Sequence, residues 1–342
     1  MRFAVLIPAW QPDQRLPALV EELTQSNIET VVVDDGSTGC DAVFAALRDR
    51  PHVTLLEHPR NLGKGRALKT GIAHLAERGF QTAVTADADG QYTAADILAV
   101  AAEAEEHPDA LILGARTIQH VRKGDRLLRN LLHLLYGIEV RDVRTGLRGI
   151  PLNDPAALLA LPGSRYEYET ALLAESPRLF PDGIREVPVR AVRADGSDGS
   201  RFRSVKDSVR CFAVLLRSLP KFIISSFSAF CIDYVLFNLL YYAVLHQTVA
   251  STIGARVVSA TYNFLLNKNW VFKGLKGRYT FVNFFLLAAC VLAANSALMY
   301  VLVDLLHLPA AVMKVFVEAL LFVVNFTVQH KLVRSPEKSK EK

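Results

Sequence analysis

The stretch Thr85-Ala86-Asp87-Ala88-Asp89-Gly90-Gln91 lies between a predicted strand at residues 81–86 and a predicted helix at 94–107, which the preceding threonine can cap. In an open α/β sheet, ligands bind where the strands end, and two acids stand at that point here. Alternation along an extended chain would aim Asp87 and Asp89 the same way. Oxygen ligands without nearby Cys or His suit a hard divalent cation, which in turn suits a diphosphate. Because the motif is short, a helix-capping loop with solvated acids is the alternative.

Short apolar runs alternate with helical segments over the first 200 residues. The runs predict buried parallel strands at residues 3–7, 30–33, 53–56 and 110–113. Helices are predicted at 16–23 and after the glycine-rich segment 61–69. This alternation predicts an α/β fold with a doubly wound, mainly parallel sheet and right-handed crossovers.

The composition changes sharply along the chain. The 342 residues are 51% hydrophobic and carry a formal net charge of +5, and the apolar surplus lies at residues 221–330. The basic residues cluster beside the apolar segments, which indicates a membrane surface and not nucleic acid. The four cysteines lack Cys-x-x-Cys spacing and are interpreted as small core residues. The N-terminus opens directly into a strand, so we expect no cleavable signal peptide.

Six short motifs, in order, carry a resemblance to a known family. They are Ile7-Pro8-Ala9, Val33-Asp34-Asp35-Gly36-Ser37, Asn61-Leu62-Gly63-Lys64-Gly65, Asp87-Ala88-Asp89-Gly90-Gln91, Gly114-Ala115-Arg116 and Asp142-Val143-Arg144-Thr145-Gly146-Leu147-Arg148. Together they resemble glycosyltransferase family 2, which has the GT-A fold, and within it the polyprenyl-phosphate sugar transferases of the dolichol-phosphate mannose synthase type. Those enzymes place Ser at the position of Thr145 and usually Phe at that of Leu147.

The resemblance implies a donor site at the ends of the strands. Donor-binding residues would be Pro8, Ala9, Asp35, Gly63, Lys64, Asp87, Asp89 and Arg193. A divalent metal, Mg or Mn, would be held on the diphosphate by Asp89 and Gln91, with Asp87 alongside. Gly63 and its neighbour Gly65 would let the backbone approach the nucleotide. Asp35 has a second interpretation as a turn acid before Gly36.

The resemblance also implies an acceptor site for a lipid phosphate. Its residues would be Arg116, Arg141, Thr145 and Arg201. The planar guanidinium of arginine can donate two hydrogen bonds to one phosphate. The implied catalytic set is Asp87, Asp89, Arg116, Arg141 and Thr145. Each arginine has an alternative role as a solvated surface charge.

Two basic amphipathic segments are candidates for the membrane interface. Leucines recur at spacings of three and four between residues 127 and 135, and apolar residues repeat the pattern between 205 and 216. Lysines and arginines flank both segments, as in helices that lie in the interface. A core-facing helix on the soluble domain is the alternative, more so for the first segment.

Four apolar runs of near-spanning length follow, at residues 222–245, 249–266, 281–303 and 309–328. Lysines and arginines precede the first run, separate the second from the third and follow the fourth. We therefore expect a protein that spans the cell membrane four times. The positive-inside rule then places both termini and the catalytic domain in the cytoplasm. The expected domains are a GT-A domain at 1–202, an interfacial helix at 203–220, a transmembrane bundle at 221–332 and a basic tail at 333–342.

The apolar half contains a repeat with an offset of 62 residues, which relates Asn263-Phe264 to Asn325-Phe326. The same offset pairs polar residues within the apolar runs, Asp233 with Asn295 and Arg256 with Glu318. Two helices per unit make this a parallel repeat. The segment 263–272 resembles the GtrA-like four-helix family, which is associated with polyprenyl-linked sugars and has a proposed flipping role.

These features predict a metal-dependent transferase that moves a hexose, with inversion, from a nucleoside-diphosphate sugar of the GDP-mannose or UDP-glucose class to undecaprenyl or dolichyl phosphate. A transporter of lipid-linked sugar with a decayed transferase domain is the alternative. A processive polysaccharide synthase would need a Gln-x-x-Arg-Trp motif, and neither Trp10 nor Trp270 lies in one. The sequence leaves the sugar, the lipid length and homo-oligomerisation open.

Overall fold

The computed structural model describes residues 2–116, 123–190, 204–240, 242, 248–271 and 281–334. The chain divides into two compact units, Met1–His133 with Ile138–Leu215, and Leu134–Gly137 with Leu216–Lys342. Arg193 and Arg201, and the side chains of Arg256 and Glu318, lie outside the described part, so the roles suggested for them stay predictions.

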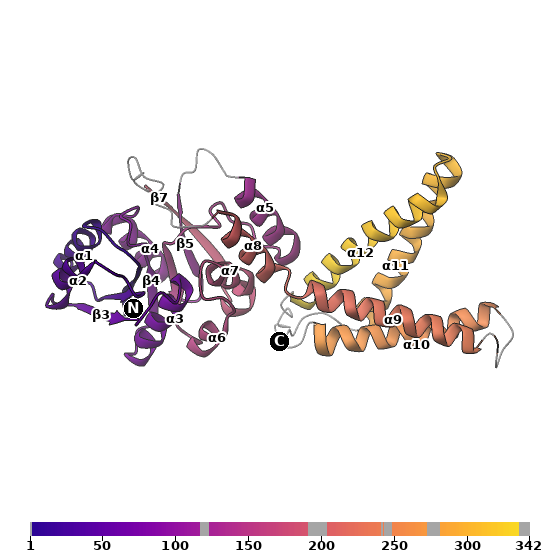
Figure 1. Ribbon diagram of the computed structural model, residues 1–342, viewed down its shortest axis with the longest axis horizontal. Coiled ribbons are helices and arrows are strands. Elements are labelled where there is room, and N and C mark those ends of the chain that lie inside the picture. Colours follow the sequence, from indigo (N-terminus) through magenta and orange to yellow (C-terminus); the bar gives the residue numbers. More distant parts are fainter. Residues whose placement is uncertain are drawn as a thin grey trace. The chain divides into compact units, whose positions relative to one another are not determined.

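The first unit contains a seven-stranded sheet in the order β3-β2-β1-β4-β6-β5-β7 (Figure 1). The strands are β1 Phe3–Ala9, β2 Thr30–Asp34, β3 Val53–Glu57, β4 Thr82–Thr85, β5 Leu111–Arg116, β6 Arg148–Pro151 and β7 Ile184–Val189. Strand β6 runs antiparallel to β4 and β5, and the other pairs are parallel. The predicted α/β class with a mainly parallel sheet is therefore confirmed.

Helices connect and follow the strands. They are α1 Arg15–Gln25, α2 Asp41–Arg48, α3 Lys64–Glu77, α4 Ala94–Glu106, α5 Lys123–Leu131 with its π-helical continuation η1 Leu132–Tyr136, α6 Pro155–Ala160, α7 Glu167–Leu179 and α8 Ser204–Leu215. Helices were predicted where α1, α3 and α4 lie, and in the segments of α5 and α8, whereas α2, α6 and α7 were not predicted. The predicted threonine cap of α4 is confirmed: the side chain of Thr93 accepts from the backbone of Asp96, whose carboxylate accepts from Thr93 in return.

The strands β1, β2, β4 and β5 are buried almost throughout, and their apolar side chains form the core together with α1 and α4. Residue Leu6 of β1 pairs with Thr85, and Ala9 pairs with Asp34, so these parallel strands finish at one edge of the sheet. The polar residues that follow each strand are gathered there, which is the place where doubly wound sheets bind ligands.

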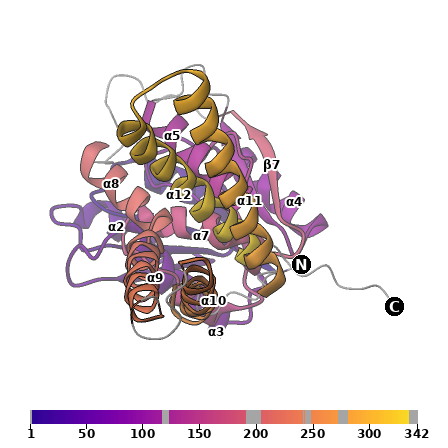
Figure 2. The same cartoon turned by 90° about the vertical axis from the view of Figure 1, so that its right-hand side faces the viewer.

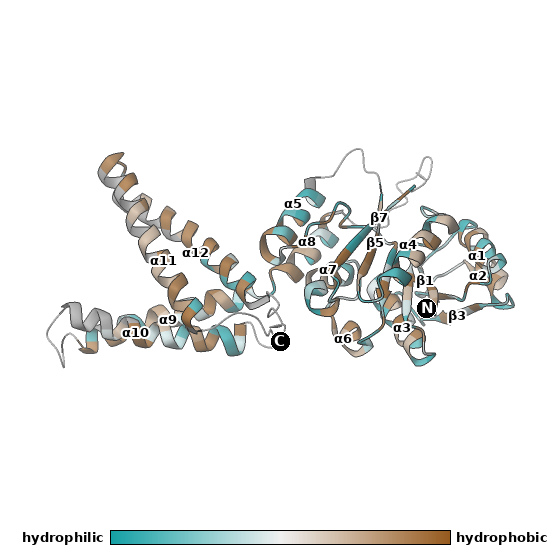
Figure 3. Cartoon of the chain, turned by 180° about the vertical axis from the view of Figure 1, so that it is seen from behind, coloured by the Kyte–Doolittle hydropathy of each residue, from teal (hydrophilic) through white to brown (hydrophobic). Residues whose placement is uncertain are grey.

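The second unit contains four helices at the four predicted apolar runs. They are α9 Leu219–Leu239, α10 Thr248–Leu266 continued by η3 Asn267–Val271, α11 Phe281–Met299 continued by η4 Tyr300–Leu305, and α12 Ala310–Arg334. Figures 1 and 2 both show α9 beside α10 and α11 beside α12, so each repeat is a helical hairpin. Figure 3 shows that these helices are largely hydrophobic.

Apolar side chains of this unit point outward. Phe227, Phe230, Val282 and Leu286 are each more than half exposed, as expected for helices that face lipid. Among the described residues, the segment Leu219–Leu236 is long and apolar enough to cross a membrane, and Val282–Val291 is a shorter apolar helix.

The two hairpins contact each other reciprocally. The ring of Phe222 on α9 lies 5.2 Å from that of Phe326 on α12, and the ring of Phe284 on α11 lies 5.4 Å from that of Phe264 on α10. Phe284 and Phe326 follow Phe222 and Phe264 by 62 residues each, the offset of the predicted repeat. Such an exchange of equivalent partners is the pattern of a two-fold symmetric dimer, here within one chain.

A polar network connects the same hairpins. Asn267 Nδ2 donates to Asn263 Oδ1 at 2.6 Å and to Gln329 Oε1 at 3.0 Å, and Gln329 Nε2 donates to Asn325 Oδ1 at 3.0 Å. Ser225 Oγ donates to Asn267 Oδ1 at 2.7 Å. The predicted polar residues Asn263 and Asn325 thus belong to one amide cluster, of which Asn267 and Gln329 are the buried members. Asp233 instead accepts from Ser259 within the first hairpin.

Candidate active site

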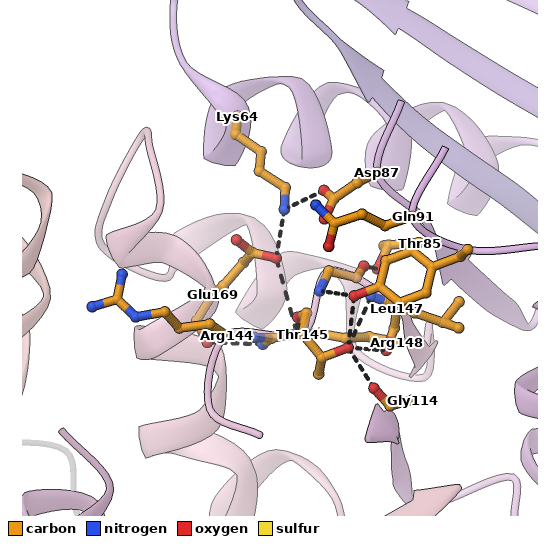
Figure 4. A network of polar contacts seen from close by, with 12 residues as sticks. Lys64, Thr85, Asp87, Gln91, Gly114, Arg144, Thr145, Leu147, Arg148 and Glu169 are labelled. Carbon is orange, nitrogen blue, oxygen red and sulfur yellow. Dashed lines mark hydrogen bonds and ion pairs between the residues drawn. The ribbon is translucent and has the colours of Figure 1, made fainter. Parts of the chain in front are cut away.

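Asp87 follows β4 and faces a partly buried lysine at the start of α3, the helix that precedes β4. Lys64, the first residue of α3, places Nζ 2.7 Å from Asp87 Oδ1 and 3.0 Å from Glu169 Oε1 (Figure 4). Burial opposes the charge on this ammonium, but Asp87 and Glu169 together raise the pKa of Lys64. The carboxylate of Asp87 also packs against Gly146, where any Cβ would collide with it.

The chain beyond Asp87 differs from the extended segment that we predicted. Residues 88 and 89 form a turn, which Gly90 closes with a φ of 73°. The turn brings Asp89 back onto Gln91, whose backbone N–H and Nε2 donate to it at 3.2 and 2.5 Å. Burial, and next the negative charge of Asp87, raise the pKa of Asp89. The two acids are therefore brought together by a glycine turn and not by strand alternation.

This arrangement fits a hard divalent cation. Asp87, Asp89 and Gln91 offer carboxylate and amide oxygens. Burial and then the charge of Asp87 raise the pKa of Asp89, and a bound cation would offset both effects. Within the described part of the chain, no three acidic, His or Cys side chains gather as a ready metal cage. A Mg site commonly has one or two carboxylates and takes its other ligands from substrate phosphates and water.

Asp35 has an internal role in this structure, and the nucleotide contact expected of it stays a prediction. Its side chain is almost fully buried, and it accepts from the backbone N–H groups of Leu62 and Gly63 at 2.9 and 2.7 Å. His58 Nδ1 lies 2.8 Å from the same carboxylate. Asp35 therefore fixes the loop that carries Lys64. Pro8 and Ala9, at the end of β1, are buried beside it.

The glycines of this loop serve the packing of the protein. Gly63 has a φ of 103°, and a Cβ there would lie 2.5 Å from the carbonyl oxygen of Ser164. A Cβ on Gly65 would lie 2.6 Å from the carbonyl oxygen of Arg165. Both glycines thus allow close packing against the segment before α7, and their approach to a nucleotide stays a prediction.

Arg116, at the end of β5, contacts both Gln91 of the acidic turn and Asp142. Its guanidinium donates two hydrogen bonds to the Asp142 carboxylate, from Nε to Oδ2 at 2.6 Å and from Nη2 to Oδ1 at 3.1 Å. Its Nη1 donates to Gln91 Oε1 at 3.1 Å. Burial opposes its charge, but the hydrogen bond to Asp142 raises the pKa of Arg116. Arg116 thus joins the acidic turn to the 142–148 loop.

Thr145 and Arg141 occupy very different places. Thr145 is fully buried, its hydroxyl donates to the Gly114 carbonyl oxygen at 2.6 Å, and Tyr92 Oη lies 3.2 Å away. The hydroxyl therefore shapes the loop in this structure, and the phosphate contact expected of Thr145 stays a prediction. The side chain of Arg141 is 87% exposed and lies 3.8 Å from Glu186. It lines a cleft of about 450 Å³ with Arg129, Asn130, His133, Ile138, Glu139, Val140 and Glu186.

Sequence reasoning missed several residues of the cluster. Glu169 and Arg148 are buried beside Lys64, and burial raises the pKa of Tyr166 and Tyr92 to about 12. Tyr92 could have been found from its place directly after Gln91. Glu169 follows no predicted strand, and none of the six motifs included it.

Two family models match separate parts of the chain. Residues 4–157 match the model of glycosyl transferase family 2, and residues 221–334 match the GtrA/DPMS transmembrane domain. A UDP-N-acetylglucosamine–dolichyl-phosphate N-acetylglucosaminyltransferase of Methanococcus voltae is 26% identical over 56% of this chain and 86% of its own length. A dolichyl-phosphate beta-glucosyltransferase of Drosophila melanogaster is 28% identical over 60% of this chain and 71% of its own length.

A solved structure shows the same fold in the first unit. Glucosyl-3-phosphoglycerate synthase from Mycobacterium tuberculosis, in complex with Mn²⁺, UDP and glucosyl-3-phosphoglycerate, has a TM-score of 0.50 and 18% identity. The match covers 63% of this chain and 79% of the synthase. It supports the GT-A fold.

Proposed function

We propose that this chain, a family 2 glycosyltransferase joined to a GtrA/DPMS transmembrane domain, transfers a hexose from a nucleoside-diphosphate sugar to a polyprenyl phosphate. The observation that carries the proposal is the polar cluster at the sheet edge. Two acids suited to a cation, Asp87 and Asp89, lie between two partly buried cationic side chains, Lys64 and Arg116. A diphosphate needs positive charge of this kind as it leaves.

The donor is a UDP sugar in this proposal. The two relatives described above are named for transfer of N-acetylglucosamine from UDP and of glucose, each to dolichyl phosphate. The sugar is accordingly glucose or N-acetylglucosamine, and a GDP-mannose donor becomes the second choice.

The reaction needs no covalent intermediate with the protein and no dedicated general base. The second pKa of the lipid phosphate is near ~6, so its oxygen is largely deprotonated at neutral pH and attacks the anomeric carbon directly, with inversion. Lys64 and Arg116 would bind and orient the diphosphate, and Arg141 would hold the incoming lipid phosphate. A Mg or Mn ion held by Asp89 and Gln91, with Asp87 alongside, would supply further neutralisation of the leaving group.

We further propose that the four helices of the second unit span the membrane, with the catalytic domain and both termini in the cytoplasm. The GtrA/DPMS match and the outward-facing apolar residues support membrane insertion. The distribution of lysine and arginine between the apolar runs supports the orientation.

The test is lipid charging by membranes that contain the full chain. They are incubated with Mg or Mn, a polyprenyl phosphate and one radiolabelled donor at a time: UDP-glucose, UDP-N-acetylglucosamine or GDP-mannose. We expect a lipid-extractable, mild-acid-labile product from one UDP sugar. Absence of product from every donor, with the protein folded and inserted, would favour the alternative of a transporter.

A further inference from the structure

Glu169 forms an ion pair with Lys64. It lies in the first turn of α7, is buried, and places Oε1 3.0 Å from Lys64 Nζ (Figure 4). The Lys64 ammonium also lies 5.7 Å from the ring centre of Tyr166, which limits its directions of movement. Lys64 is thus shared between two carboxylates, Glu169 and Asp87.

The two carboxylates differ in how firmly they are held. Arg148 anchors Glu169: its Nη1 donates to the Glu169 carbonyl oxygen at 2.9 Å, and its Nε lies 3.9 Å from Oε1. Arg148 is itself fully buried and also donates to the Thr145 carbonyl oxygen. The side chain of Asp87 is 25% exposed and follows the strand into the turn where cation and diphosphate would bind. Glu169 is therefore the fixed partner of Lys64, and Asp87 is the exchangeable one.

We infer that Glu169 is a positioning residue, which keeps the Lys64 ammonium in place while its second partner changes from Asp87 to the diphosphate of the donor. The inference rests on the proposed function, because it takes a nucleoside diphosphate as the ligand. The exchange makes and breaks ion pairs only. It also releases Asp87 for the cation, so that one lysine couples the arrival of the diphosphate to the arrival of the metal.

Loss of Glu169 leaves Lys64 paired with Asp87 alone. The ammonium then competes with the cation for Asp87 and loses the support that directs it at the diphosphate. Because Glu169 acts through Lys64, its removal has no further effect when Lys64 is absent. A purely structural role would instead give losses that add.

The test is a double-mutant cycle with the full chain in detergent. Binding of UDP and of GDP is measured by calorimetry, with and without Mn²⁺, for wild type, Lys64→Ala, Glu169→Gln and the double variant. We expect each single variant to weaken the preferred nucleotide about tenfold or more, the size of one lost charge pair, and the double variant to match Lys64→Ala. Glu169→Asp keeps the charge and should lose less than Glu169→Gln.

Glu175→Gln is the matched control, since Glu175 is a buried acid on the same helix that pairs with Arg178. It should bind nucleotide as wild type does. Additive losses, or wild-type affinity in Glu169→Gln, would overturn the inference and leave the proposed function intact. A lower melting temperature in Glu169→Gln with unchanged affinity would overturn it as well. A wild-type chain that binds neither nucleotide would contradict both the inference and the proposed function.

Discussion

Gly63 and Ser164 lie so close that a single added methyl group would force them apart. A Cβ on Gly63 would lie 2.5 Å from the Ser164 carbonyl oxygen, and the backbone of Gly63, at φ 103° and ψ 152°, is in a region that other residues avoid. Two segments a hundred residues apart in the sequence are packed through this contact. The loop that carries Lys64 is therefore positioned by the segment that leads into α7.

The first prediction tests this packing. Gly63→Ala should lower stability by more than the ~1–3 kcal/mol of backbone strain alone, because the collision adds to the strain. Gly79→Ala is the control, since Gly79 also has a positive φ, 73°, but open space around its Cβ position. Thermal melting of the two variants in detergent gives the comparison. Equal losses would show that the contact with Ser164 is easily relieved.

The second prediction concerns the metal site. Asp89→Ala should abolish sugar transfer while the protein still folds and inserts, because the cation loses a carboxylate ligand and the diphosphate its counter-charge. Turnover is measured with saturating Mg or Mn, and chelation of the metal should stop wild-type turnover too. Activity of the variant within about tenfold of wild type, only ~1.4 kcal/mol, would contradict a metal role.

The third prediction separates Arg141 from Thr145. Arg141 is exposed, so Arg141→Ala should fold normally, raise the KM for the polyprenyl phosphate and leave donor binding nearly intact. Thr145→Val should instead lower the melting temperature, because it leaves the buried Gly114 carbonyl without its donor, a loss of about 1–3 kcal/mol. If Arg141→Ala lost donor affinity in parallel, this arginine would belong to the diphosphate side.

The fourth prediction concerns the amide cluster between the hairpins. Asn267→Ala removes a hydrogen-bond partner from Asn263, Gln329 and Ser225 at once, and should destabilise the second unit by about 1–2 kcal/mol. Exchanging the two side chains, Asn267→Gln with Gln329→Asn, keeps their summed length. In detergent melts this double variant should retain more stability than the sum of its single changes predicts. Strict additivity would show that the two amides are not coupled.

The fifth prediction concerns topology. In a background without the four native cysteines, single cysteines near Lys276 and Lys338 should react only from the cytoplasmic side, and one near Gln247 only from the opposite side. A membrane-impermeant maleimide applied to intact cells and to inverted vesicles gives the readout. Labelling of the Gln247 site in sealed inverted vesicles would contradict the four-span arrangement.

Strand-by-strand patterns were enough for most of the sheet, because buried parallel strands are continuous apolar runs. Strands β6 and β7 were not predicted. The four residues of β6, Arg148–Pro151, contain a charge, a glycine and a proline, and the place of this strand in the sheet depends on its neighbours. Arg148 is buried there with Glu169, a partner far away in the sequence. Patterns along the chain carry no information about such a pairing.

The polar residues at the sheet edge separate what the motifs could predict from what they could not. The residues that gather at the sheet edge were predicted, since strand ends can be read from the sequence. The contacts of each side chain could not be predicted. Asp35 accepts hydrogen bonds from the backbone of Leu62 and Gly63, and Thr145 donates one to the Gly114 carbonyl oxygen. Those bonds depend on how loops fold back over one another. The 62-residue repeat was visible because duplicated positions keep their chemistry, but the contact between Asn267 and Gln329 requires the packed hairpins.

The exchanged phenylalanine pairs have a consequence for how this unit assembles. Phe222 contacts the second hairpin in the same way that Phe284 contacts the first, so each hairpin presents one face that fits the other. Two separate chains with one hairpin each would have to meet before such faces could pair. Because both hairpins belong to one polypeptide, each meets its partner at an effective concentration that does not depend on expression level. The two repeats need not be identical, and one has asparagine at 267 where the other has glutamine at 329.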